Sequence, residues 1–335
     1  MPVLTDEEKA TLRVEHFIFH SVHHGKPDPT LRNRVHIGKF EPFFVARVID
    51  TLKGNRFVFD TASPTLAALR GAEEDPTTFV EMSKELARQF HREDDQTKHD
   101  GRFKRGILMV AILRAGDRRF HSLIKFDHGG QVIDIVEEDA DATLAEVLNP
   151  LTENKKALQK SALIELDADG GRLVVIDHSK RSGITDFFQE FLGAQRAKEA
   201  PELTDAVVRG VLATVRAHAT ELPPQVCAQW RERLTDIALR RQEFDADQVF
   251  SDLFGAGGTE AVRSTWDAQL AANDVEGEGF SFDHGSLPST GPRKYRTAEN
   301  IEITVPPGAK DTFVWDEQDD GSVIVTIRTS SLVAR

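Results

Sequence analysis

The chain has 335 residues, of which 39% are hydrophobic, and it carries a formal net charge of −13 at pH 7. This length and apolar content suffice for two domains with sizeable cores. A single cysteine, Cys227, excludes an internal disulfide. No apolar run approaches the roughly 18 residues of a membrane span, and the acidic N-terminus lacks the apolar stretch of a signal peptide. We therefore expect a cytoplasmic protein with no membrane partner.

Strands and helices are predicted to alternate through the first half of the chain. A strand over residues 12–22 precedes a helix over 41–52, a short strand over 56–59 and an amphipathic helix over 76–90. Three strands are expected over 107–113, 120–126 and 132–136. The turn sequence from Asp167 to Gly171 predicts a hairpin of residues 162–166 and 172–176.

The most distinctive stretch runs from Ile176 to Ala194 and reads IDHSKRSGITDFFQEFLGA. Its apolar residues recur at helical spacing and predict a helix with one apolar face: Ile184, Phe187, Phe188, Phe191 and Leu192. Thr185 or Ser182 can cap the start of this helix, and Gly193 is typical of a helix C-cap. Lys180 and Arg181 lie at its entrance, where a basic turn can hold an anionic partner in a fixed place.

The second half is predicted to be helical and then β again. An apolar stripe at Val208, Val211, Leu212 and Val215 indicates a helix, and further helices are expected over 225–241, 245–254 and 260–272. Residues 273–298 are polar, contain glycine and proline, and predict a linker. Strands close the chain over 301–305, 312–315 and 322–329. We expect an α+β fold with an N-terminal mixed sheet and helices (1–196), then a helical region followed by C-terminal β-strands (197–335).

The charged residues are unevenly distributed, which matters because an acidic protein binds DNA only where its bases are segregated. Residues 101–126 contain seven Lys or Arg and one acid, whereas residues 131–150 contain six acids and no base. Most candidate phosphate contacts lie in predicted turns, three are spaced for one face of a helix (Lys155, Lys156 and Lys160), and three lie in the late linker (Arg293, Lys294 and Arg296). Those in turns are Arg102, Lys104, Arg105, Arg118, Arg119, Lys180 and Arg181. Ordinary surface heterogeneity remains the alternative.

Two other groups of residues are of the types that catalytic or metal sites use. His16, His20, His23 and His24 crowd the first strand, but without a partner cysteine or an HExxH pattern we expect no metal there. Acids on or beside the predicted hairpin, together with a lysine, could serve a Mg²⁺-dependent nuclease: Glu165, Asp167, Asp169, Asp177 and Lys180. Acids are also common in hairpin turns. We therefore expect no catalytic residue, metal or cofactor, and a structural thiol at Cys227.

The pattern K-R-x-G-x-x-D-F-F-x-x-F-L-G-A, from Lys180 to Ala194, resembles bacterial nucleoid-associated proteins of the NdpA type, the 37-kDa nucleoid-associated family. Less specific similarities cover nearly the whole chain: Val14–Val22, Glu41–Phe59, Gly106–Leu113 and Asn300–Arg328. The resemblance implies a nucleoid protein that binds double-stranded DNA without catalysis, and we expect a homo-oligomer, a dimer. The alternatives are a protein-interaction component of a larger assembly, such as a phage-defence system, or third, the nuclease.

Overall fold

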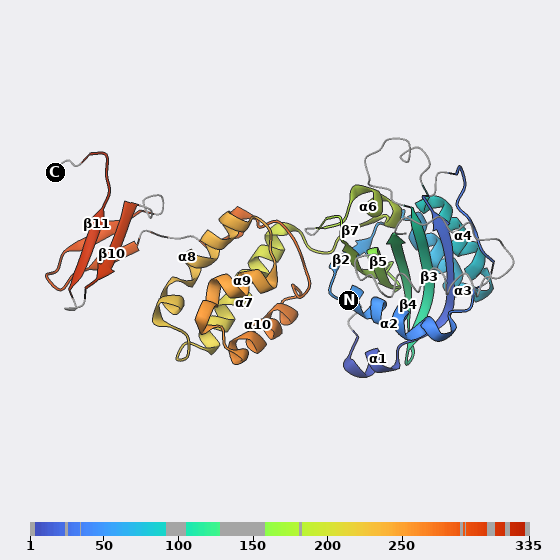
Figure 1. Cartoon of the computed structure of the whole chain (residues 1–335), viewed down its shortest axis with the longest axis horizontal. Coiled ribbons are helices and arrows are strands. Elements are labelled where there is room, and N and C mark those ends of the chain that lie inside the picture. Colours follow the sequence, from blue (N-terminus) through green and yellow to red (C-terminus); the bar gives the residue numbers. More distant parts are fainter. Residues whose placement is uncertain are drawn as a thin grey trace.

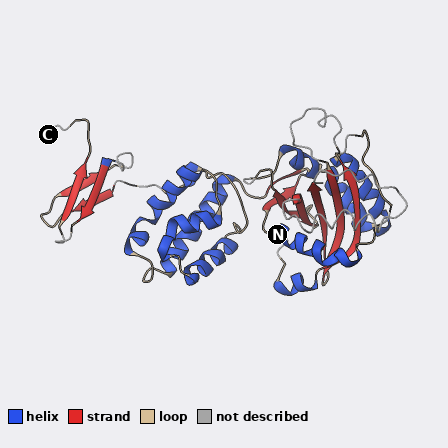
Figure 2. Cartoon of the chain, in the orientation of Figure 1, coloured by secondary structure: helices blue, strands red, loops and turns tan. Residues whose placement is uncertain are grey.

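A computed structural model describes residues 4–23, 26–33, 35–91, 105–127, 158–180, 183–288, 291, 293–306, 312–318 and 322–331. Their helices and strands form a sheet covered by helices, a group of helices, and two small β-ribbons at the C-terminus (Figures 1 and 2). The α+β class and this order of parts are confirmed. No helix among the residues described is long and apolar enough to cross a membrane. The predicted strand over 132–136 lies outside the described residues.

The sheet has seven strands in the order β1-β3-β4-β5-β6-β2-β7. They are β1 (Arg13–Val22), β2 (Asn55–Phe59), β3 (Gly106–Ala115), β4 (Arg118–Asp127), β5 (Leu158–Glu165), β6 (Arg172–Asp177) and β7 (Ala194–Arg196). Every described pair is antiparallel, where a mixed sheet was expected. Tight turns explain part of this: Gly116 takes a φ of +61° between β3 and β4, and β5 and β6 form the predicted hairpin.

Five described helices surround this sheet: α1 (Asp6–Thr11), α2 (Glu41–Thr51), α3 (Pro64–Glu74), α4 (Phe79–Phe90) and α6 (Asp186–Leu192). Strand β3 is buried at nine of its ten positions, because both faces of the sheet are covered at its centre. The predicted helix over 76–90 begins as a 3₁₀ turn at Pro76–Thr78. Helices α1 and α3 were not predicted, although Thr5 and Ser63 cap their starts.

The helical region consists of α7 (Ala200–Ala217), α8 (Pro224–Arg241), α9 (Ala246–Phe254) and α10 (Glu260–Ala272). Its hydrophobic core is separate from that of the sheet. The core of the sheet has Ala194 as its last residue, and the helical core begins at Leu203. Aromatic side chains fill the helical core, and the Trp266 ring lies 6.3 Å from Phe254 and 6.4 Å from Phe250. The division of the chain at residue 196 into two folding units stays a prediction.

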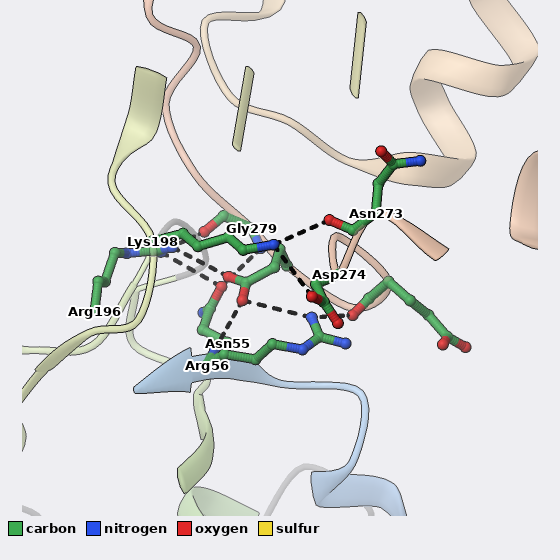
Figure 3. A network of polar contacts seen from close by, with 9 residues as sticks. Asn55, Arg56, Arg196, Lys198, Asn273, Asp274 and Gly279 are labelled. Atoms are coloured by element: carbon green, nitrogen blue, oxygen red, sulfur yellow. Dashed lines mark hydrogen bonds and ion pairs between the residues drawn. The ribbon is translucent and has the colours of Figure 1, made fainter. Parts of the chain in front are cut away.

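The segment after α10 is docked against the sheet and is not the linker that its composition predicted (Figure 3). Glu278 is buried and accepts the backbone N–H of Arg56 at 2.9 Å and the Arg196 guanidinium at 3.1 Å. Gly279 donates its N–H to Asn55 Oδ1 at 2.7 Å. These contacts join β2 and the edge strand β7 to the segment that follows the helical region. The polar composition of this segment predicted a linker, because the sequence does not show that the sheet supplies partners for its charged side chains.

Two antiparallel ribbons end the chain. The first pairs β8 (Arg293–Arg296) with β9 (Glu302–Val305), and the second pairs β10 (Phe313–Glu317) with β11 (Val323–Ile327). The Tyr295 and Phe313 rings stack at 4.8 Å and bring the ribbons into contact. Figure 1 shows the β10–β11 ribbon beyond the helical region, far from the seven-stranded sheet. Strand β8 was expected to be linker.

Candidate nucleic-acid interface

A buried carboxylate at the end of β6 organises the turn that leads into α6. Asp177 Oδ2 accepts hydrogen bonds from the Lys160 ammonium at 2.5 Å and from the Thr185 N–H and hydroxyl at 2.9 and 2.7 Å. Asp177 Oδ1 accepts the Ser179 N–H at 2.9 Å. One side chain therefore holds both ends of the turn, at residues 179 and 185, against the sheet.

The Lys160–Asp177 ion pair is enclosed by protein. Both residues are buried, and Lys160 Nζ lies 5.6 Å from the centroid of the Phe188 ring. Burial by itself would raise the pKa of Asp177, but hydrogen bonds from Lys160 and Thr185 hold that pKa below its usual range. Asp177 is consequently charged at neutral pH, and the Lys160 ammonium is engaged within the fold.

Helix α6 fixes the far side of the same turn. Phe188, Phe191 and Leu192 are buried, and the Phe191 ring lies 4.8 Å from Phe90 of α4. Gly193 ends the helix at a φ of +56°, and a Cβ there would lie 2.7 Å from the Ser63 side chain, so only glycine fits. Thr185 is the N-cap residue, but its hydroxyl serves Asp177 instead of the helix N–H groups.

Lys180 projects from this fixed turn. Its side chain is about half exposed, at 49%, and its ammonium is 3.9 Å from Asp186 Oδ1, at the limit of an ion pair. Arg181 lies outside the described residues. Because the backbone around Lys180 is held at both ends, an anion that binds there meets a charge whose position is already set.

Four strands begin or end at the same end of the sheet as this turn. Gly106 pairs with Asp127, Lys125 with Lys160, and Lys160 with Asp177, so β3 and β5 begin where β4 and β6 end. Arg105, which is partly exposed, immediately precedes β3. Four other candidate bases precede β3 or β5 in sequence and lie outside the described residues: Arg102, Lys104, Lys155 and Lys156. Lys160 lies in strand β5, which corrects its expected place on a helix.

Arg118 and Arg119 begin β4 at the opposite end of the sheet from this turn. Arg118 makes a bidentate contact with Glu165 at 2.8 and 2.9 Å, and it also reaches Glu8 at 2.8 Å. Arg119 contacts Glu15 at 3.2 Å and Glu73 at 3.0 Å. The structure therefore does not bring these two arginines together with Arg105 and Lys180.

The remaining candidate bases lie on β8 of the C-terminal ribbons. Lys294 and Arg296 are exposed, and Arg293 begins the strand. Strand β8 pairs with β9, separately from the seven-stranded sheet, and so forms a distinct basic element.

The carboxylates of the nuclease alternative are divided between the two ends of the β5–β6 hairpin. Glu165 is opposite Arg172, whereas Asp177 is opposite Lys160 at the other end. Asp167 accepts the Asp169 N–H at 3.0 Å, as hairpin turn residues commonly do. Asp177 and Glu165 thus serve ion pairs at separate places.

The histidines near β1 hold a loop onto α4. His20 Nδ1 accepts the Arg32 N–H at 3.2 Å, so Nε2 carries the proton and donates to Ser83 Oγ at 3.0 Å. His23 donates its backbone N–H to His91 Nδ1 at 3.0 Å. Within the described ranges, no three His, Cys, Asp or Glu side chains are grouped as metal ligands. His24 lies outside those ranges.

A cleft of about 870 Å³ opens beside Asp177, between the sheet and the α8–α9 connection. Three acids, Glu243, Asp245 and Asp247, line its helical side. Arg240 and Arg241 also line it, but their guanidiniums donate to Asp252 at 3.0 and 2.6 Å, and Lys53 lines it as well. With Asp177 and Glu278 also in its lining, the cleft has more acids than bases and disfavours a phosphate, which leaves the exposed side of the Lys180 turn as the better anion site.

The sequence did not reveal that Asp177 holds the basic turn or that Glu278 joins the two cores. The only local signal for Asp177 was its place two residues before Ser179, the spacing of an Asx turn. Glu278 gave no signal, because its partners Arg56 and Arg196 lie far away in the sequence.

Comparison with known families matches residues 45–328 to the family described as nucleoid-associated protein YejK. No curated protein matches the chain. The matched region includes the basic turn, α6 and the C-terminal ribbons, and it confirms the resemblance to nucleoid-associated proteins that the sequence indicated. Since the match spans most of its length, the chain belongs to the nucleoid-associated protein YejK family.

Proposed function

We propose that this protein binds double-stranded DNA on the bacterial nucleoid, in the cytoplasm, through phosphate contacts and with little sequence preference. It acts by stoichiometric binding and not by catalysis, as a homodimer. Family membership supports a nucleoid role. The observation that carries the DNA contact is the turn between β6 and α6, which Asp177 holds in place while Lys180 stays exposed.

The acidity of the chain is compatible with this proposal because much of it is concentrated away from the turn. Residues 197–288 contain 16 Asp or Glu and eight Lys or Arg. A phosphate backbone is repelled by such a surface and attracted to local bases. The DNA-facing side is accordingly the end of the sheet where β6 ends and where β3 and β5 begin.

Phosphate contacts alone predict weak discrimination between sequences. Lys and Arg on phosphates position a protein on the duplex but read no base edges. The two described candidate bases that are exposed or partly exposed at this end of the sheet, Arg105 and Lys180, lie directly before β3 and in the turn after β6, not along the face of a recognition helix. We therefore expect similar affinities for unrelated duplexes of equal length.

The test is binding of the full chain to labelled duplex DNA across a salt series, comparing wild type with the double variant Lys180→Ala, Arg181→Ala. Loss of two phosphate contacts should lower the affinity and make the slope of log K against log salt shallower by about 2. The matched control is Arg172→Ala, an exposed base at the other end of the same hairpin, which should change neither quantity.

An unchanged affinity and slope in the double variant would remove this turn from the interface. Repeating the series with Mg²⁺ tests the non-catalytic part, since cleavage of the duplex would contradict it. A wild-type protein that fails to bind even at low salt would contradict the DNA-binding proposal altogether.

A second candidate function, a protein-interaction component of a larger assembly, is favoured by one observation. The exposed apolar side chains of the C-terminal ribbons are of the kind that partner proteins cover. A stable complex with a second kind of protein, together with no DNA binding at low salt, would support this candidate over the first.

A further inference from the structure

Large exposed hydrophobic side chains are concentrated in the C-terminal ribbons. In the described part of the chain, all of them but Leu239 lie between residues 301 and 327. They are Ile301, Val314, Trp315, Val323, Ile324, Val325 and Ile327. Trp315 is 44% exposed and Ile327 is 57% exposed. Scattered single residues of this kind need no explanation, but a contiguous group indicates a binding surface.

The register of the second ribbon places four of these residues on one face: Trp315, Val323, Val325 and Ile327. Phe313 pairs with Ile327 and Trp315 with Val325, so these four positions are on the same face, and Val323 follows at the next position, opposite Glu317 at the end of the ribbon. The other face mixes apolar Val314 and Ile324 with polar Asp316 and Thr326. An apolar face on a two-stranded ribbon needs a further layer, because such a ribbon is only marginally stable in water.

The charges near this face favour a second copy of the same chain as its occupant. Residues 293–296 of β8 contain three bases and no acid, whereas residues 312–327 contain four acids and no base. In a two-fold dimer the basic strand of each copy can lie against the acidic ribbon of the other, and this complementary contact then occurs twice. Nucleic acid is disfavoured on the β10–β11 ribbon, because its acids repel phosphate.

We propose that the β10–β11 ribbon is the dimer interface, in which the face of Trp315, Val325 and Ile327 packs against the same face of a second copy. This inference rests on the homodimer of the proposed function and names the surface that forms it. A dimer would join two Lys180 turns in one particle. Two weak phosphate-binding sites that act together bind a long duplex more tightly than either alone.

The first test measures mass in solution by sedimentation equilibrium on the full chain. Wild type should be a dimer at micromolar concentration, and the double variant Trp315→Ser, Ile327→Ser should be a monomer. The control is Leu239→Ser, which removes an apolar side chain that is 52% exposed on α8 and should leave the dimer intact. Neither hydrophobic core contains a residue of the β10–β11 ribbon. The far-UV circular dichroism and the main thermal transition should therefore be the same in wild type, the double variant and the control.

Charge reversal tests whether the occupant is a second copy of the chain, independently of the apolar contact. The variant Lys294→Glu, Arg296→Glu should dimerise more weakly than wild type, and so should Asp316→Lys. Mixing the two variants should restore dimerisation, because each then offers the charge that the other needs. If mixing restores nothing, the complementary pairing proposed here is wrong.

Two results would overturn the inference. A dimer that survives both ribbon substitutions would place the interface elsewhere, and a wild-type monomer at high micromolar concentration would remove the homodimer. Neither result bears on DNA binding, which is measured separately. The monomeric ribbon variant should still bind a short duplex with the wild-type slope of log K against log salt.

Discussion

At the scale of single residues, Asp177 illustrates how one buried acid can set the position of an exposed base. It accepts hydrogen bonds from Lys160, Ser179 and Thr185, and these contacts fix the turn on which Lys180 is exposed. Lys160 was a candidate phosphate contact by sequence. Its burial and its pairing with Asp177 favour a positioning role.

Replacing Lys160 by methionine should distinguish the two roles. Asp177 would keep a buried charge without its main partner, which typically costs about 3–5 kcal/mol of stability, and the turn should loosen. DNA affinity should fall while the salt slope stays at the wild-type value, because Lys160 itself contacts no phosphate. Lys180→Ala should instead make the slope shallower by about 1. A similar change in slope in the Lys160 variant would show that Lys160 does contact phosphate.

His20 should make the stability of the protein depend on pH. Burial, with Arg32, Lys84 and Arg88 nearby, lowers the pKa of His20 to about 3, against about 6.5 in an unfolded chain. The unfolded state therefore binds the extra proton below pH 6.5, and the free energy of unfolding attributable to His20 should fall as pH decreases, by about 1.4 kcal/mol per pH unit. Denaturant unfolding between pH 7 and pH 4.5 should show a weaker pH dependence in His20→Gln. An equal dependence in the variant and wild type would contradict this role.

At the scale of elements, the contact between the sheet and the helical region depends on the segment between α10 and β8. Burial raises the pKa of Glu278 although Arg196 and Arg56 oppose that change. Gly277 takes a φ of +77°, and a Cβ there would lie 2.7 Å from the Lys53 carbonyl oxygen. The chain can approach β2 this closely only because residue 277 is glycine.

Glu278→Ala should therefore weaken the docking of the helical region. Both arginines would lose their carboxylate, at a cost of about 3 kcal/mol, and the single unfolding transition of wild type should separate into two. Glu276→Ala is the matched control, since Glu276 is exposed and accepts from the Arg56 guanidinium through its backbone carbonyl, which alanine keeps. Calorimetry measures both variants, and one unchanged transition in Glu278→Ala would show that the docking does not depend on this residue.

At the scale of the whole molecule, the proposed basic contact, the acidic surface and the exposed apolar surface lie on different parts of the chain. The proposed DNA contact lies at one end of the sheet, the helical region is acidic, and the exposed apolar side chains lie on the terminal ribbons. A dimer through the ribbons would leave the turn of each copy accessible. The ribbon substitutions should consequently weaken binding to a long duplex more than to a short one.

The sequence by itself determined the elements whose signals are local. Periodicity predicted α4, α6 and the helices of the second half, turn residues predicted the β5–β6 hairpin, and Gly193 predicted the end of α6. The family followed from the same stretch, from Lys180 to Ala194. Such signals depend on neighbouring residues, whose spacing and backbone preferences are written directly in the chain.

Only the tertiary structure decided which residues share a site. Strand order and register place Arg118 and Arg119 at one end of the sheet and Lys160 with Asp177 at the other, although all are bases or acids in similar predicted turns or strands. Arg56 and Glu278 meet across 222 residues of sequence. Pairs of this kind arise from the order in which strands join and regions dock, and no local spacing encodes that order.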